Sequence, residues 1–465
     1  MEQLEKRYGL PMAICMVVGT VIGSGIFFKA QNVLAATGGD MPLGIVAWVT
    51  TGLLMIFCAL QFAQMGTRYG KVSGVVDYAE ATCGKSYGYY LAWFLANIYY
   101  PGMTSVLAWV SARYFGVLFG WSMVSAEVLV LAGFFLIASY TLNAFSPRLA
   151  GKFQISATVI KLIPIFLMAV VGTIVGFYNG TLTDNFTNVA TEVVGGSGSG
   201  LLAAIVATVF AYEGWICATS INAELKNAKK NLPLALVIGS LIVVVAYVFY
   251  YIGVAGGASN KVLMEEGATT AFTNIFGGVG GTVLNICIVI SCLGTLNGLM
   301  VAATRGMYAI SCRNEGPRPD LFGQIDKATN MVTNSSIWGL FVCGVWLLYF
   351  YGANLSEGGW FGYFNFDSSE LPIITIYALY IPIFVRWMLT EKKLSFVKRF
   401  LLPGAAIVAC LVMVVAAVYA HGVTPYLAAQ AEGEFSCPVL FYIIVFAAVM
   451  AAGAYFQKPK RATAA

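Results

Sequence analysis

Charged residues are scarce in this chain. Asp, Glu, Lys and Arg together make up 10% of its 465 residues, whereas they make up about 25% of an ordinary soluble domain. A soluble protein of this length would divide into two or three domains with charged surfaces. The composition therefore excludes a soluble globular protein.

Histidine and paired cysteines are rare as well. The single histidine, His421, falls in a predicted exterior loop and is a poor candidate for a proton relay. The ten cysteines lie mostly in apolar segments and form no CxxC pair, a pattern typical of small buried hydrophobic side chains. Because no nucleophile–base pair or metal-ligand cluster is evident, we expect neither an enzyme nor a metal or other cofactor.

Long hydrophobic runs account for most of the chain, which is 59% hydrophobic. The runs are about 20 residues long, the length that crosses about 30 Å of hydrocarbon. We predict an all-α polytopic membrane protein, one transmembrane domain over residues 1–465 with no soluble domain. Its twelve transmembrane helices are expected near 11–36, 42–66, 87–112, 124–144, 153–177, 200–221, 233–256, 280–310, 333–352, 367–387, 400–420 and 437–456.

Basic residues gather on one side of this predicted topology. All but four of the 26 Lys and Arg residues, the exceptions being Lys29, Arg113, Lys161 and Lys261, fall in the segments that share a side with the N-terminus. The positive-inside rule then predicts a multi-pass cell-membrane protein with cytoplasmic N- and C-termini. This topology explains the net charge of +5 without a nucleic-acid partner. The long first apolar stretch is not typical of a cleavable signal peptide.

Three glycines interrupt the first predicted span, in the segment Gly19-Thr-Val-Ile-Gly23-Ser24-Gly25-Ile-Phe. A membrane helix can be broken only beside protein or a polar cavity, and transporters use such breaks to bind substrates. Gly19 and Gly23 also form a GxxxG packing pair, but packing does not explain the neighbouring Ser24-Gly25. We predict a break here.

The predicted break suits a zwitterion. The amides of Gly23, Ser24 and Gly25 would hold a substrate carboxylate. The carbonyls near Val21 and Ile22 would accept hydrogen bonds from its α-amino group.

The sixth predicted span contains a second irregular segment, Phe210-Ala-Tyr-Glu213-Gly214-Trp. A carboxyl group at this depth costs about 2.5–3.5 kcal/mol, so a chance occurrence is disfavoured. Carbonyls freed at Phe210, Ala211 and Glu213 would bind the substrate ammonium. Glu213 itself could tune that site, pair with another group or carry a proton, and Phe210 could act as a gate or only pack.

Breaks in the first and sixth spans predict two inverted five-helix repeats, near 11–177 and 200–387, followed by extra helices over 400–456. At 1.5 Å per residue, Ser24, Tyr212 and Lys161 lie about 20, 18 and 12 Å from the starts of their spans. All three therefore fall in the middle third of the bilayer.

Lys161 is the most informative single residue. A mid-membrane lysine needs partners, and Pro164 one turn later disturbs the helix around it. A compact ammonium there can serve as a fixed charge where another carrier would hold sodium. The alternative is a structural lysine that extends towards the cytoplasmic face.

Three further segments are weaker candidates. In the eighth span Ser291-Cys-Leu-Gly-Thr295 brings small polar groups into a long helix, which suits either helix packing or a binding site. Tyr99 and Tyr100 precede a proline in the third span. Asp367-Ser-Ser-Glu370 opens the tenth span and is either an exterior gate or a solvated helix end.

The glycine break, the Phe210–Trp215 segment and Lys161-Leu-Ile-Pro-Ile resemble those of the amino acid–polyamine–organocation superfamily, in particular its L-amino acid transporter subfamily. The resemblance covers essentially the whole chain. It implies a LeuT-like five-plus-five inverted repeat and sodium-independent exchange of amino acids by alternating access. The site residues it implies are the carboxylate-binding Gly23, Ser24 and Gly25, the ammonium-binding Val21, Phe210 and Glu213, the gate Phe210, and Lys161 in place of sodium.

Small or medium neutral L-amino acids are the expected substrates, because the predicted pocket offers no obvious counter-ion for a charged side chain. Animal members of the subfamily use a cysteine between the third and fourth spans to attach a heavy chain, and residues 113–124 contain none. We therefore expect no disulfide-linked heavy chain. A proton-coupled symporter or uniporter of the same fold is the alternative, and a nutrient sensor is disfavoured because a large signalling region is lacking.

Overall fold

The computed structural model describes residues 5–23, 25–69, 73–122, 125–187, 200–327, 329–356 and 358–457. Within these ranges the chain is helical, with two isolated β-bridges and no strand. Ser24, one of the predicted carboxylate ligands, lies outside the described residues.

The helices of the first half are joined by short connections or continue directly into one another. In chain order they are α1 (Leu10–Val21), α2 (Gly25–Ala36), α3 (Met41–Arg68), α4 (Val75–Cys83), α5 (Lys85–Phe94), η1 (Leu95–Tyr99), α6 (Tyr100–Val117), α7 (Ala126–Phe145), α8 (Pro147–Leu167), η2 (Met168–Gly172), α9 (Thr173–Asn179) and α10 (Thr181–Thr187).

The second half begins after the segment 188–199, which is not described. Its helices are α11 (Gly200–Val209), η3 (Phe210–Tyr212), η4 (Trp215–Glu224), α12 (Ala228–Ala255), α13 (Asn260–Glu266), α14 (Ala268–Ser311), α15 (Pro319–Phe322), α16 (Thr333–Asn354), η5 (Gly362–Phe364), α17 (Leu371–Thr390), η6 (Val397–Leu401), α18 (Leu402–Val418), η7 (Tyr419–Val423), α19 (Thr424–Ala431) and α20 (Pro438–Phe456).

Ten helical stretches in the described part of the chain are long and apolar enough to cross a membrane. The all-α multi-pass architecture is therefore confirmed. The other two predicted spans, 11–36 and 87–112, correspond to the α1/α2 pair and to the α5–η1–α6 helix. The count of twelve spans stays a prediction.

Several helices extend beyond the predicted apolar runs. α14 begins at Ala268, well before the predicted start at residue 280, and bends at Gly277, where φ is +77°. The helix from Val397 continues through η7 and α19 to Ala431, although its predicted end was residue 420. A hydrophobic run marks only the part of a helix that lies in hydrocarbon. The helical backbone itself continues until a bend or a cap ends it.

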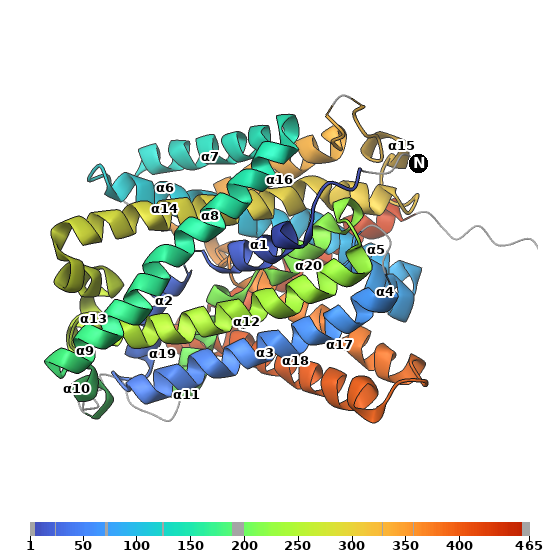
Figure 1. The fold of residues 1–465 in the computed structure, drawn as a ribbon. Helices are drawn as coiled ribbons and strands as arrows, with labels where there is room; N and C mark the ends of the chain where they lie inside the picture. Colours follow the sequence, from blue (N-terminus) through green and yellow to red (C-terminus); the bar gives the residue numbers. More distant parts are fainter. Residues whose placement is uncertain are drawn as a thin grey trace, which may run out of the picture.

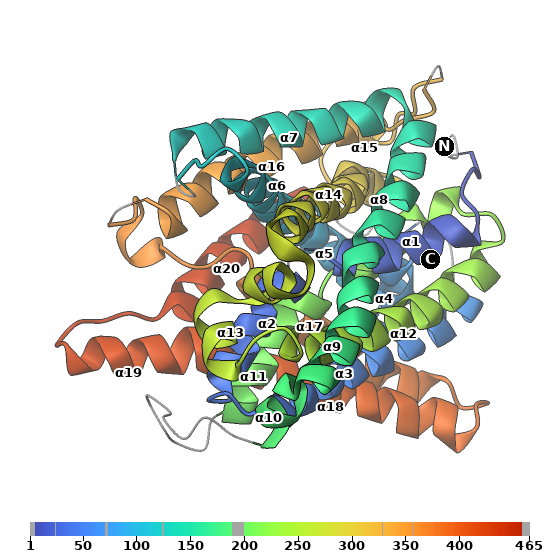
Figure 2. The ribbon, with the colours of Figure 1, turned by 60° about the vertical axis from the view of Figure 1, so that its left-hand side comes forward.

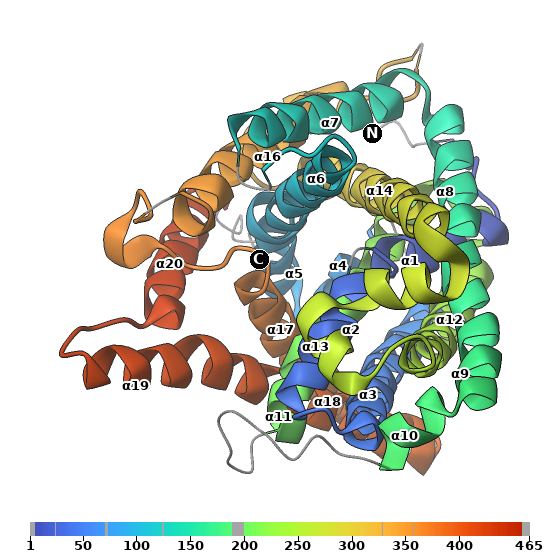
Figure 3. The same cartoon turned by 90° about the vertical axis from the view of Figure 1, so that its left-hand side faces the viewer.

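The long helices form one bundle around the first span. In Figure 1, α3, α12 and α14 run lengthwise through the molecule, and α8 runs obliquely to them. α1 packs against α8, α12, α14 and η4, so the first span is enclosed, as Figure 3 shows in the view along the bundle. α7, α16 and α20 lie at the perimeter in Figures 2 and 3. Enclosure of α1 places its unpaired backbone groups against protein, as a broken membrane helix requires.

Candidate substrate site

The first span is broken as predicted. α1 ends at Val21, Ile22 takes an extended conformation with φ −74° and ψ 92°, and a new helix begins at Gly25. The carbonyls at the end of α1 lose their normal partners in the next helical turn. They must therefore be satisfied by groups from other helices, by water or by a ligand.

The sixth span is broken at Glu213 and Gly214. Glu213 is extended, with φ −83° and ψ 160°, and Gly214 has a left-handed φ of +103°. This conformation costs other residues about 1–2 kcal/mol, so glycine is required for backbone reasons. Beyond it the chain continues as the 3₁₀ helix η4 rather than as an α-helix.

Two side chains bring the breaks together. The Thr20 hydroxyl oxygen lies 3.0 Å from the Gly214 carbonyl oxygen. The Tyr247 hydroxyl on α12 lies 3.0 Å from the Val21 carbonyl oxygen and 2.9 Å from that of Ala211, so one proton is shared between the two breaks. Neither Thr20 nor Tyr247 carried a sequence prediction. The available signal was the Tyr247 hydroxyl in the middle of an apolar helix, which needs a partner when buried.

Lys161 projects from α8 onto the first break and is completely buried. Its Nζ lies 2.8 Å from the Gly19 carbonyl oxygen and 3.2 Å from the Thr295 hydroxyl oxygen, and it also donates to the Ile22 carbonyl. The Thr295 hydroxyl lies 3.0 Å from the Gly19 carbonyl oxygen, to which it can donate its own proton. An ammonium group has three N–H donors, and three neutral oxygens surround it here.

The eighth span contributes to the same place. Besides Thr295, the Ser291 hydroxyl oxygen lies 3.3 Å from the carbonyl oxygens of both Ile22 and Gly23. A Cβ atom on Gly23 would come within 3.1 Å of the Thr295 hydroxyl oxygen. The polar segment of α14 therefore faces the break, in addition to any packing role.

Glu213 is also buried, with 4% of its surface exposed. The Tyr99 hydroxyl, from the π-helical turn η1, donates to Oε1. Among the described residues, no donor reaches Oε2. An unsatisfied buried carboxyl oxygen is costly, so this atom marks a place for a proton, a water molecule or a ligand.

The predicted carbonyl ligands divide into two groups. The carbonyls of Val21 and Ala211 point to a common centre at Tyr247. The Ile22 carbonyl accepts from Lys161, and the Phe210 carbonyl lies 3.3 Å from the Glu213 amide nitrogen. The structure therefore brings the Val21 and Ala211 carbonyls together at one hydroxyl as candidate acceptors, whereas the Ile22 and Phe210 carbonyls face different donors.

A charged cluster lies at the far end of the bundle from the N-terminal segment. Lys29 Nζ is 3.0 Å from Glu370 Oε1 and 5.5 Å from the centre of the Phe210 ring. His421 Nε2 is 2.7 Å from Glu370 Oε2. Phe210, Glu370, Tyr377 and His421 line one pocket. Glu370 is therefore ion-paired rather than a solvated helix end, and His421 lies in η7, a helix, rather than in the predicted loop.

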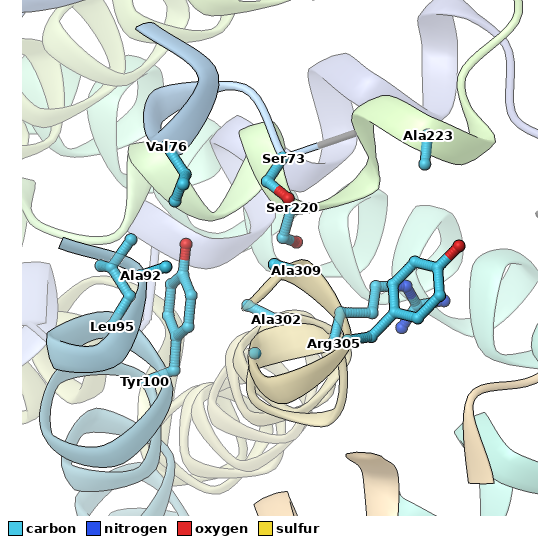
Figure 4. Close-up of a pocket in the computed structure, with 12 residues that line it drawn as sticks. Ser73, Val76, Ala92, Leu95, Tyr100, Ser220, Ala223, Ala302, Arg305 and Ala309 are labelled. Carbon is cyan, nitrogen blue, oxygen red and sulfur yellow. The ribbon is translucent and has the colours of Figure 1, made fainter. Parts of the chain in front are cut away.

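A second ionic cluster lies at the end that carries the N-terminal segment. Glu224, at the end of η4, is paired with Arg7 at 3.1 Å and with Arg305 at 2.6 Å. Arg305 also lines a pocket between η4, α14 and the third span, in which Tyr100 and Ser220 approach from facing walls (Figure 4). Ionic contacts thus lie at both ends of the bundle.

The sequence matches a known protein family. The amino acid permease family model matches residues 8–452. The serine/threonine exchanger SteT of Bacillus subtilis is 34% identical over 318 residues, which are 68% of this chain and 70% of SteT. The mouse b(0,+)-type amino acid transporter 1 is 29% identical over 308 residues, 66% of this chain and 62% of that protein.

A further relative by sequence and one solved structure are also similar to this chain. The human cystine/glutamate transporter is 26% identical over 328 residues, 70% of this chain and 64% of its own length. The crystal structure of MhsT in complex with L-phenylalanine has a TM-score of 0.56 at 15% identity and covers 90% of this chain and 100% of MhsT. That likeness shows the LeuT fold, with its discontinuous first and sixth helices. By the family match over nearly its whole length, this chain belongs to the amino acid permease family.

Proposed function

We propose that this protein is a sodium-independent antiporter that exchanges small or medium neutral L-amino acids by alternating access. Membership of the amino acid permease family makes amino acid transport the general activity. The observation that carries the finer proposal is the pair of facing helix breaks, with the Lys161 ammonium held beside the first of them.

The two breaks supply both halves of a zwitterion site. α2 begins at Gly25, where the positive end of a helix dipole favours a carboxylate, and the amides of Gly23, Ser24 and Gly25 would hold that carboxylate. The carbonyls of Val21 and Ala211 face one another across the Tyr247 hydroxyl. Each carbonyl has a second lone pair, which is available to a substrate ammonium group.

Sodium independence is supported by a lysine ammonium that lies among three oxygen atoms beside the first break. Gly19, Ile22 and Thr295 present oxygen atoms that suit a hard monovalent cation, and Lys161 Nζ lies among them. A fixed ammonium there takes the place of a dissociable ion, so no sodium gradient is coupled to transport. Phe210, beneath the Lys29–Glu370 pair, acts as the gate on the outer side.

The similarity to SteT, a serine/threonine exchanger, favours exchange of small neutral amino acids. A polar but uncharged substrate side chain suits a site in which the carboxylate and ammonium of the substrate are both met by peptide groups.

A proton-coupled symporter or uniporter is the second candidate. The Glu213 carboxyl supports it, because Oε2 has no donor among the described residues and the group is buried beside the break. A carboxyl in that position can carry a proton from one side to the other.

We place the protein in the cell membrane with both termini cytoplasmic, as the basic residues indicate. We also propose that it works without a disulfide-linked heavy chain, since residues 113–124 contain no cysteine. The two repeats near 11–177 and 200–387 would rock around the breaks.

The test is uptake into proteoliposomes. Vesicles loaded with unlabelled amino acids are given radiolabelled alanine, serine, leucine, arginine or glutamate, with and without sodium and with and without a pH gradient. Exchange predicts uptake of the neutral substrates only when the vesicles are loaded, unchanged by sodium. Uptake into empty vesicles that follows the proton gradient would support the symporter instead.

A further inference from the structure

Side chains from three segments that are distant in the sequence meet at the outer end of the bundle. Lys29 comes from α2, Glu370 precedes α17, and His421 lies in η7 after α18. The Glu370 carboxylate uses a different oxygen for each partner, Oε1 for Lys29 at 3.0 Å and Oε2 for His421 at 2.7 Å. His421 belongs to the helices that follow both predicted repeats. Its contact with Glu370 therefore connects a helix outside the repeats to the Lys29–Glu370 pair inside them.

The cluster covers the pocket that leads towards the sixth-span break. Phe210, Tyr377 and Met413 line that pocket below it, and Lys29 lies over the Phe210 ring. The side chains of Lys29, Glu370 and His421 are 12%, 21% and 18% exposed. They are packed closely enough to block the pocket and exposed enough to exchange protons with the exterior.

The charged groups that face His421 come from two neighbouring elements. Glu370 and Asp367 approach from the segment that leads into α17, and Lys29 approaches from α2. The same pocket receives only the apolar Met413 and Ala417 from α18. On α20, the polar group of Tyr442 has a different partner: its hydroxyl oxygen lies 2.7 Å from the Thr375 hydroxyl oxygen.

The charge balance of this cluster depends on the imidazole. When His421 is neutral, the Glu370 carboxylate faces one positive group, the Lys29 ammonium. When His421 is protonated, a second positive group faces Glu370 in this partly buried place, and the His421–Glu370 hydrogen bond becomes an ion pair. Histidine changes charge between about pH 5 and 8, so exterior pH controls this balance.

We propose that His421 is a positioning residue of the outer gate, which holds Glu370 against Lys29 and makes the closed gate more stable when the exterior is acidic. The closed state binds the proton more tightly than the open state, because opening separates the imidazole from Glu370 and Asp367. Stability of the closed state therefore rises as pH falls through the histidine range.

The size of the expected pH effect on gate opening follows from the linkage between proton binding and gate closure. A difference of one pKa unit between closed and open states corresponds to a tenfold change in their ratio. We expect the outer gate to open about threefold to tenfold less often at exterior pH 5.5 than at pH 7.5.

Accessibility of a new cysteine in the pocket measures this opening without any substrate. Val206 lines the pocket beneath the cluster, and Val206→Cys is labelled on intact cells with a membrane-impermeant maleimide at both pH values. The matched control is Gln430→Cys on the exposed surface of α19, which corrects for the pH dependence of the thiol reaction. The unsubstituted protein supplies the background from its ten native cysteines.

The quantity compared is the labelling rate of the Val206→Cys variant divided by that of the Gln430→Cys variant. This ratio should fall by about threefold to tenfold on acidification. His421→Gln keeps an N–H donor but cannot titrate, so its ratio should not change with pH. His421→Arg carries a permanent charge and should give the low ratio at both pH values. If His421→Gln does not reach the membrane, His421→Arg decides the question alone.

An unchanged ratio in the parent protein would overturn the proposal, and so would a His421→Gln or His421→Arg variant that still follows pH. Because labelling requires no transport, this failure is distinct from failure of the exchange assay.

Discussion

The two helix breaks differ in the ionisable side chain beside them and in how they are maintained. The first, after Val21, has the Lys161 ammonium beside it, surrounded by neutral oxygens. The second carries the Glu213 carboxyl, which is bound by the neutral Tyr99 phenol. The first is extended at Ile22, whereas the second turns through a left-handed Gly214.

The difference shows which break depends on its neighbours. At the first break, side chains of α8 and α14 satisfy the freed carbonyls, so its geometry is set by tertiary contacts. At the second, the glycine conformation sets the turn locally. We expect the first break to be the one that changes during transport, because contacts between helices can be broken and remade more readily than a local backbone turn.

The largest expected effect comes from removing the cation of the first break. Lys161→Ala leaves the Gly19 and Ile22 carbonyls without this donor, at a cost of about 1–3 kcal/mol each. Exchange in loaded proteoliposomes should fall at least about tenfold. The control is Lys152→Ala, which removes an exposed lysine of the same helix. Full exchange activity in the Lys161 variant would remove the proposal that lysine replaces sodium.

An alanine at each break tests whether the turn is local. Gly214→Ala places a side chain at φ +103° and within 3.1 Å of the Thr20 carbonyl oxygen, so it should destabilise the protein by about 1–2 kcal/mol. Gly23→Ala meets only the Thr295 side chain, with its hydroxyl at 3.1 Å, and should affect exchange more than thermal stability. Thermal unfolding in detergent, with Gly133→Ala at an open position of α7 as control, separates the two. Equal melting temperatures for both variants would contradict the contrast between the breaks.

The smallest expected effect concerns the hydroxyl that joins the breaks. Tyr247→Phe removes one shared hydrogen bond, worth about 1 kcal/mol, and leaves the Val21 and Ala211 carbonyls less well oriented. The KM of exchange should rise about fivefold with little change in the maximal rate. Tyr250→Phe, on the same helix, is the matched control, because its hydroxyl has no partner among the described residues. A fall in maximal rate at constant KM would place Tyr247 in the conformational step instead.

Much of the fold and part of the site could be predicted from the chain itself. Hydrophobic runs placed most spans, and glycine patterns placed both breaks, because a bilayer requires regular helices and exposes every interruption. The presence of Lys161 and Glu213 in apolar runs marked them for the same reason. The ends of α14 and α19 were misjudged, since helices continue beyond hydrocarbon.

Contacts between distant helices required the tertiary structure. No pattern in the sequence indicated that Tyr247 would reach both Val21 and Ala211, or that His421 would share Glu370 with Lys29. By itself the sequence determined that the chain spans a membrane and where its helices break, because those features follow from local composition and backbone chemistry. Only the packing of the bundle decided which oxygen each donor meets, because hydrogen bonds depend on distances of about 3 Å between groups that the chain separates by many residues.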